Sequence, residues 1–176
     1  ELPIFSAVCV KGAPNLALAL EGPVPAWKAF GTPGSGNGGY QKTYGLPRFA
    51  EAEFDVSVAG GTIRPHNGGI VGPLATGFVE QYRADYAIIG IGAVDSDGTL
   101  LDFYPDEVSA AQAMMRNGRR VLLVADHTKF SRTATVAQGK LKDVSVLFTD
   151  CAPPAPIARL IERNDIEVVL CPSRRP

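Results

Sequence analysis

Glycines and polar residues follow the apolar runs of this sequence at positions where they could bind a small ligand. The set comprises Gly60, Gly61, Gly92, Asp97, Gly98, Thr99, Asp126 and Lys129, and Asp150 follows a further apolar run. Glycine lets the backbone turn tightly and approach a ligand, so its N–H group can bind an anion. Lysine supplies a positive charge, while carboxylates and hydroxyls can bind the hydroxyl groups of a ligand. These residue types together suit an anionic small molecule.

The apolar runs that precede these residues have the pattern of buried parallel strands. Residues 86–91 and 121–125 are continuously apolar, and the helix-forming stretch 107–117 lies between them. Strands that are buried on both faces and joined by a helix are typical of a parallel sheet. Further strands are predicted at residues 54–59, 144–149 and 167–170, and further helices at 74–82 and 156–164. The sequence therefore predicts a doubly wound, mainly parallel α/β sheet flanked by helices, with ligands bound at the carboxyl ends of its strands.

The first two predicted helices in chain order each carry an apolar stripe. Leu74, Phe78 and Tyr82 recur at spacings of four, and Pro73 suits the first turn of that helix. Val108, Ala111 and Met115 form the stripe of the second helix, which we expect to pack in the core. Glu107 is expected to complement the positive end of this helix, and Arg119-Arg120 its negative end.

The first third of the chain is less regular. Residues 4–10 have strand character, residues 15–21 suggest a short helix, and residues 22–48 are rich in Gly and Pro and are predicted to form a long loop. The glycines of this loop match neither a Walker loop nor a dinucleotide fingerprint, because no helix signal follows them. We therefore divide the chain into a divergent segment at 1–52, a core at 53–172 and a frayed tail at 173–176.

Composition and charge exclude several classes of function. The 176 residues carry a net charge of -1, which gives no basic surface for nucleic acid. Cys9, Cys151 and Cys171 lack metal-binding spacing and are expected to be free thiols in a reducing cytoplasm. With only His66 and His127 as imidazoles, a histidine-rich metal site is excluded, and no metal or cofactor is expected. No apolar run approaches the length that spans a bilayer.

Three stretches resemble the C-terminal effector domain of DeoR/GlpR-type bacterial transcriptional repressors. They are GGTIRPHNGGIVGPLA, ADYAIIGIGAVDSDGTLLDF, and VLLVADHTKFSR followed by DVSVLFTD, within residues 53–172. The most specific piece is residues 126–130, which is similar to the family's Asp-x-Ser-Lys-Phe signature. The resemblance implies the fold of ribose-phosphate isomerase, glucosamine-phosphate deaminase and CoA-transferase, and a phosphorylated sugar or related metabolite as ligand.

The resemblance also implies a sensor that controls a linked helix-turn-helix module and self-associates as a homo-oligomer. That module is not within this sequence, and the start at Glu1 without a methionine suggests a piece of a longer protein. DNA would then be bound only through the missing module. The N-terminal third departs from the family, because the Asp-x-Gly-Thr-Thr loop after the first strand is not found and Lys11-Gly12 stand where many relatives carry Thr-Asn.

If a sugar phosphate is the ligand, each candidate residue has a role. Lys129 would bind the phosphate with the amides of Gly60 and Gly61, and Asp97, Thr99 and Asp126 would bind hydroxyls. Each residue also has a plainer explanation. Asp126 and Asp150 could cap local turns, Lys129 could be a surface lysine, and the glycine pair could form a tight turn only. His127 is expected to be a solvent-facing loop residue.

An enzyme of the same fold is the main alternative. A sugar-phosphate isomerase or deaminase needs a base at the substrate carbon and a proton relay for ring opening. Deaminases of this fold carry Asp-Gly-His after the central strand, whereas this chain has Asp97-Gly98-Thr99, whose hydroxyl cannot act as a base near neutral pH. A nucleotide-binding module rests on the glycines alone. The sequence therefore favours a non-catalytic sensor.

Overall fold

The central layer of the structure is a seven-stranded sheet in which neighbouring strands run parallel. The computed structural model describes residues 7–8, 29–31, 56–57, 59–64 and 69–171. The strands are β1 (Ala7–Val8), β2 (Ala29–Gly31), β3 (Val56–Ser57), β6 (Ala84–Ile89), β9 (Gly118–Val124), β11 (Val146–Thr149) and β12 (Glu167–Leu170). Their order is β12-β11-β9-β6-β1-β2-β3, so the strand order reverses between β1 and β6. The prediction of a mainly parallel α/β sheet is confirmed.

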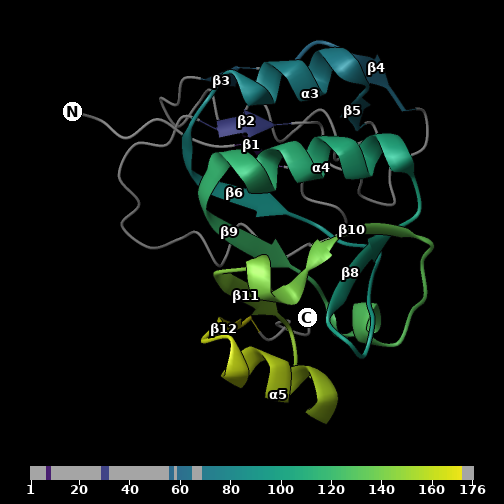
Figure 1. The fold of residues 1–176 in the computed structure, drawn as a ribbon, viewed down its shortest axis with the longest axis vertical. Helices are drawn as coiled ribbons and strands as arrows, with labels where there is room; N and C mark the ends of the chain where they lie inside the picture. The colour runs from purple at the N-terminus through teal and green to yellow at the C-terminus, as the bar shows by residue number, and fades with distance from the viewer. Residues whose placement is uncertain (1–6, 9–28, 32–55, 58, 65–68, 172–176) are drawn as a thin grey trace, which may run out of the picture.

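The α-helices among the described residues are α3 (Pro73–Glu80), α4 (Pro105–Asn117) and α5 (Ala155–Arg163). Each has a proline in its first two positions, where a missing N–H group costs nothing and the fixed φ suits a helix. Val79, Met114 and Ile157, one from each helix, join the same hydrophobic cluster. All three helices therefore cover one face of the sheet, and Figure 1 shows α3 and α4 lying in front of it.

The core lies between these helices and the middle strands. Side chains alternate along β9, because Val121 and Leu123 join the cluster under the helices while Leu122 and Val124 join a second cluster on the other face. Leu123 is completely buried. Burial of a leucine side chain stabilises a fold by about 1.5–3 kcal/mol. The buried apolar side chains of the middle strands therefore provide much of the stability of the domain.

Two small antiparallel sheets are added to the central layer. The strands β7 (Ala93–Val94), β8 (Thr99–Asp102) and β10 (Val136–Lys140) form one of them, and β4 (Thr62–Ile63) pairs with β5 (Ile70–Val71) in the other. Two short 3-10 helices, η1 (His127–Phe130) and η2 (Leu141–Asp143), follow β9 and β10. Because β7 packs against η1, the loops that leave β6 and β9 are neighbours.

Most elements predicted between residues 70 and 171 are confirmed with small shifts at their ends. The helices predicted at 107–117 and 156–164 correspond to α4 and α5, and the strand at 167–170 corresponds to β12. In α4 the predicted stripe packs inward, since Val108 and Ala111 are buried and Met115 is partly buried. In α3 the stripe is only partly correct, because Leu74 is 73% exposed while Ala75 is buried.

Three expectations were wrong in detail. The stretch between β6 and α4 was predicted as loop, but it contains β7 and β8. Residues 29–31 of the predicted long loop form β2 in the central sheet. Arg119 and Arg120 lie on β9 and not at the end of the helix. From β9, Arg119 pairs with Asp85, and Arg120 pairs with Glu167. The helix expected at 15–21, His66 and the tail at 173–176 lie outside the described residues, and the domain boundaries stay a prediction.

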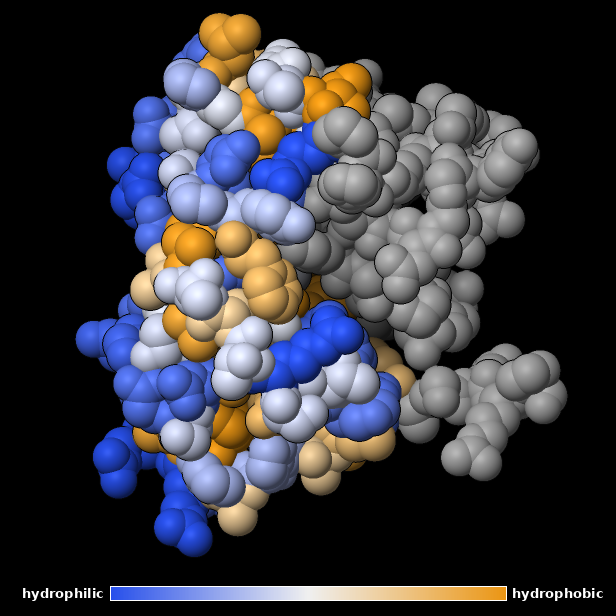
Figure 2. Space-filling view, turned by 90° about the vertical axis from the view of Figure 1, so that its right-hand side faces the viewer, coloured by the Kyte–Doolittle hydropathy of each residue, from blue (hydrophilic) through white to orange (hydrophobic). Residues whose placement is uncertain are grey.

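The surface toward which the strands point is mixed in character. Figure 2 views the molecule from the side to which the carboxyl ends of β6 and β9 point in Figure 1. Hydrophobic residues occur there in small groups that are separated by hydrophilic ones.

Among the described residues, none of the helices has the length and apolar character needed to cross a bilayer.

Candidate functional site

The strongest candidate site is η1, the 3-10 helix that follows β9. Asp126 precedes it and caps it, because its Oδ1 accepts hydrogen bonds from the Thr128 backbone N–H at 2.9 Å and from Thr128 Oγ1 at 2.5 Å. The Lys129 N–H donates to the Asp126 carbonyl oxygen at 3.0 Å and closes the turn. The capping role proposed for Asp126 from sequence is therefore present, and it fixes the position of the lysine three residues later.

Lys129 is not an ordinary surface lysine. Only 12% of its side chain is exposed, and its Nζ lies 3.6 Å from Asp126 Oδ2. Such a distance is that of an ion pair and is too long for a strong direct hydrogen bond. An ammonium group held away from solvent at the end of a parallel strand is suited to bind an anionic oxygen.

The next strand supplies the partner of His127. The His127 backbone N–H donates to Asp150 Oδ1 at 2.7 Å, and its ring Nδ1 lies 2.5 Å from Asp150 Oδ2. His127 faces solvent as expected, with 61% of its side chain exposed, but it lies in η1 and is bonded to Asp150. The hydrogen bond to Asp150, followed by the charge of that carboxylate, raises the pKa of His127 above its usual value.

The two aspartates keep their negative charge for different reasons. Burial alone would raise the pKa of Asp126, but hydrogen bonds from Thr128 and the charge of Lys129 outweigh it, so that this pKa is lowered. Burial also acts to raise the pKa of Asp150, and the hydrogen bonds from His127 lower it overall. Asp126, Lys129 and Asp150 thus form a charged group at the ends of β9 and β11.

Gly92 lies in the loop after β6, beside this group. Its N–H donates to the Leu101 carbonyl oxygen at 3.0 Å. A Cβ at this position would lie 2.9 Å from the Phe103 ring and 3.0 Å from Asp102 Oδ1, closer than side chains normally approach. The structure therefore gives Gly92 a packing role, and its amide is already bonded.

Asp97, Gly98 and Thr99 form a separate group at the β7–β8 turn. Thr99 begins β8 and donates from both its N–H and its Oγ1 to Asp97 Oδ1, at 2.8 and 2.5 Å. Lys140 on β10 reaches Asp97 Oδ2 at 3.1 Å and Thr99 Oγ1 at 2.5 Å. Gly98 has φ +81, which glycine adopts without strain. The observed partners of these residues are within the turn, on Lys140 and on Leu141, whose N–H donates to the Gly98 carbonyl oxygen at 2.7 Å.

This turn gives a testable dependence of stability on pH. Hydrogen bonds from Thr99 and Lys140 lower the pKa of Asp97 from 3.8 to about 2. A carboxylate with a lowered pKa stabilises the folded state above its unfolded pKa, and that stability is lost as the pH falls through the folded pKa. We expect Asp97→Asn to lower the melting temperature at pH 7 and the loss to shrink as the pH falls from 3.8 toward 2, measured by circular dichroism.

The matched control is Asp165→Asn, an exposed aspartate in a turn with φ 53 that asparagine also tolerates. We expect this control to leave the melting temperature nearly unchanged at every pH. A loss in Asp97→Asn that stayed constant across the pH range would contradict the role given to this carboxylate.

Gly60 and Gly61 precede β4, beside the β4–β5 hairpin. A Cβ at Gly61 would lie 2.6 Å from the Val71 carbonyl oxygen, and its φ of +148 is rare for other residues. Space around Gly60 is open, with nothing within 4 Å of a Cβ built there. The tight-turn explanation thus accounts for Gly61, and a ligand role of Gly60 stays a prediction.

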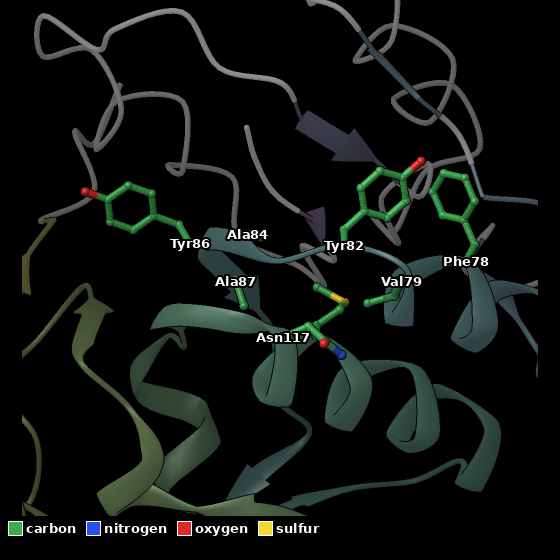
Figure 3. A pocket seen from close by; sticks show the side chains of 8 residues that line it. Phe78, Val79, Tyr82, Ala84, Tyr86, Ala87 and Asn117 are labelled. Atoms are coloured by element: carbon green, nitrogen blue, oxygen red, sulfur yellow. The ribbon is translucent and has the colours of Figure 1, made fainter. Parts of the chain in front are cut away.

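A small apolar pocket lies at the opposite, amino-terminal end of β6. It is formed between the ends of α3 and α4, where the Phe78 and Tyr82 ring centroids are 5.2 Å apart, and Figure 3 shows these rings above the side chains of Val79 and Asn117. The described residues that line it include no lysine or arginine. Among its described residues, the pocket therefore has no cation to pair with a phosphate.

Two residues of the candidate region were missed from sequence. Thr149, the last residue of β11, is buried, and among the described residues its Oγ1 has no hydrogen-bond partner. Cys151 lies exposed directly after Asp150. Their positions in the chain carry no motif. Only the pairing of β9 with β11 places them beside η1.

Part of the chain matches a known family of proteins. Residues 47–151 match the DeoR C terminal sensor domain. The chain is 45% identical over 117 residues to the HTH-type transcriptional repressor CsqR of Escherichia coli, which covers 66% of this chain and 45% of the repressor. It is 40% identical over 119 residues to the glycerol-3-phosphate regulon repressor of E. coli, covering 68% and 47%.

A third relative extends the comparison to another species. The glycerol-3-phosphate regulon repressor of Haemophilus influenzae is 43% identical over 118 residues, which is 67% of this chain and 46% of the repressor. The chain thus matches about half the length of these curated relatives. Because the sensor-domain match covers more than half of the chain, including η1 and β11, the protein belongs to the family of DeoR C-terminal sensor domains.

Proposed function

We propose that this chain is the ligand-sensing part of a bacterial transcriptional regulator and that a phosphorylated sugar, or a related phosphorylated metabolite, binds at the carboxyl ends of β9 and β11. The family supports a sensor, and the relatives named as repressors support a role in transcription. DNA would be bound by a linked helix-turn-helix module in the cytoplasm. Self-association as a homo-oligomer belongs to the same proposal, because repressors of this type act on paired DNA sites.

The burial of the Lys129 side chain is the observation that supports a phosphorylated ligand. Its largely buried ammonium would bind the phosphate, since a cation that is shielded from water attracts a dianion more strongly than an exposed one. Asp126 keeps free electron pairs for ligand hydroxyls even while it caps η1. The glycerol-3-phosphate regulon named for two relatives supports a small phosphorylated compound as the class to test.

Signalling would depend on a difference in affinity between two states of the protein. A ligand shifts a conformational equilibrium only as far as it binds one state more tightly than the other. The ligand would bind η1, and η1 is bonded to β11 through His127 and Asp150. Binding would therefore favour one arrangement of these two elements.

A sugar-phosphate isomerase or deaminase is less well supported. Asp97, on which that alternative depended, lies in the β7–β8 turn with Thr99 and Lys140 as its partners. The curated relatives are named as regulators. A non-catalytic sensor thus accounts for both observations.

A thermal-shift screen tests the proposal directly. The panel holds phosphorylated sugars and glycerol 3-phosphate, with the unphosphorylated compounds and inorganic phosphate as controls. A ligand at one hundred times its Kd adds about 2.7 kcal/mol to the stability of the folded state. For a domain of this size that raises the melting temperature by roughly 5–10 °C. Equal shifts with every phosphate compound, or none with any, would contradict a specific sensor.

A further inference from the structure

Three side chains that can bind metal ions lie together beside η1. A ring nitrogen of His127, a carboxylate oxygen of Asp150 and the Sγ of Cys151 all lie within 4.8 Å of one another. His127 comes from η1 after β9, whereas Asp150 and Cys151 come from the loop after β11. The ligand contacts proposed above involve neither His127 nor Cys151.

The parallel pairing of β9 with β11 brings these residues together. Val124 of β9 lies opposite Phe148 of β11, so the loops that follow these two strands start side by side at the same edge of the sheet. The Ala125 N–H donates to the Phe148 carbonyl oxygen at 3.0 Å and extends the pairing by one residue. The bond from the His127 N–H to Asp150 Oδ1 then holds the two loops at a fixed separation.

The geometry needs only a small adjustment to hold a metal. Bonds of about 2.0–2.3 Å place the ligand atoms of a tetrahedral zinc site roughly 3.5 Å apart. The widest spacing, at most 4.8 Å, must therefore shrink by about 1 Å. The 2.5 Å between His127 Nδ1 and Asp150 Oδ2 must widen by about 1 Å as the proton between them leaves. His127 and Cys151 are exposed and can rotate by that amount. Asp150 can keep Oδ1 on the His127 amide and offer Oδ2 to the ion.

The donor set selects the class of cation. Imidazole, thiolate and carboxylate suit Zn²⁺ and similar borderline ions, whereas Mg²⁺ and Ca²⁺ prefer oxygen ligands alone. We propose that His127, Asp150 and Cys151 form a site for Zn²⁺ or a similar thiophilic divalent cation, with the fourth position open to water or another ligand. Binding would release the thiol proton of Cys151 and the proton between His127 and Asp150 to solvent.

This site was excluded from sequence because its ligands do not form a motif. His127 lies 23 positions before Asp150 in the sequence, and Cys151 follows Asp150. One histidine and one cysteine so far apart do not have the spacing of a metal-binding motif. The proposal is independent of the sugar-phosphate site, since Lys129 is not among the ligands. Either one can fail without the other.

Titration with Co²⁺ under a thiol-free reductant tests the proposal on the 176-residue chain. We expect thiolate-to-cobalt absorption that saturates at one ion per chain and is displaced by Zn²⁺. Cys151→Ser should lose this absorption, and His127→Gln should weaken Co²⁺ binding at least tenfold, because loss of even an outer partner of a metal ligand commonly costs that much. Both side chains are exposed, so both variants should melt like the parent without metal.

Cys171→Ser is the matched control. Cys171 is half-buried and is not one of the three clustered residues, so its replacement should leave the absorption unchanged. The proposal is overturned if the parent chain gives no thiolate-to-cobalt absorption, if the control variant rather than Cys151→Ser loses it, or if His127→Gln binds Co²⁺ as tightly as the parent.

Discussion

Lys129→Met is expected to weaken binding of the phosphorylated ligand by roughly 10- to 100-fold. A hydrogen bond to a charged group contributes about 1.5–3 kcal/mol, and the variant removes the ammonium that we assign to the phosphate. Methionine keeps most of the apolar stem, which matters because only 12% of this side chain is exposed. The measurement is isothermal titration calorimetry with the compound that gives the largest thermal shift.

Lys142→Met is the matched control for this experiment. Lys142 is an exposed lysine on η2, so the same change of residue there should leave the affinity unchanged. The melting temperature of Lys142→Met should stay close to that of the parent, whereas Lys129→Met should lower it slightly, because Asp126 loses its paired cation. If Lys129→Met binds the ligand as tightly as Lys142→Met does, the phosphate is bound elsewhere.

Leu123→Ala should lower the free energy of unfolding by about 2–5 kcal/mol, the range found for leucines that leave a cavity in a core. Leu123 is completely buried near the carboxyl end of β9, in the cluster that joins α3, α4 and α5 to the sheet. Loss of its methyl groups removes contacts that the packed helices and strands cannot restore by small movements. Urea denaturation followed by circular dichroism measures the change.

The same substitution on an exposed leucine provides the comparison. Leu170 is the last residue of β12, at the edge of the sheet, and is 55% exposed. Leu170→Ala should therefore lower the free energy of unfolding by well under about 1 kcal/mol, as surface substitutions usually do. Similar losses in the two variants would show that the stability of the domain does not depend on the cluster around Leu123.

The central part of the fold could be predicted because its signals are long. The runs 86–91 and 121–125, which include the buried ends of β6 and β9, are continuously apolar and are separated by a helix with a clear stripe. The type of each element therefore followed from local sequence. β7 has only two residues, and β8 four, which is too short for an alternating pattern to be recognised beside the Asp95–Gly98 turn. Their pairing with β10 is a long-range contact that no local pattern records.

The candidate site could be predicted only in part, for a similar reason. Asp126 and Lys129 are close in sequence and were identified together, and the capping geometry of η1 explains their spacing. The burial of Lys129 and the bonds between His127 and Asp150 depend on the register of β9 against β11. Register is set by side-chain packing across the whole sheet, so it could not be deduced from either loop alone.

The two bonds from His127 to Asp150 also limit how the site can move. The backbone bond ties η1 to the end of β11, and the ring adds a second bond to the same carboxylate. A ligand that draws Lys129 inward must therefore either pull the end of β11 along with η1 or break both bonds together. β11 leads into α5 and pairs with β12. If the end of β11 moves with η1, the displacement therefore reaches β12, which is the edge of the sheet on that side. Under the proposed function, the carboxylate of Asp150 would couple a ligand bound at Lys129 to β12, the edge strand on that side of the sheet.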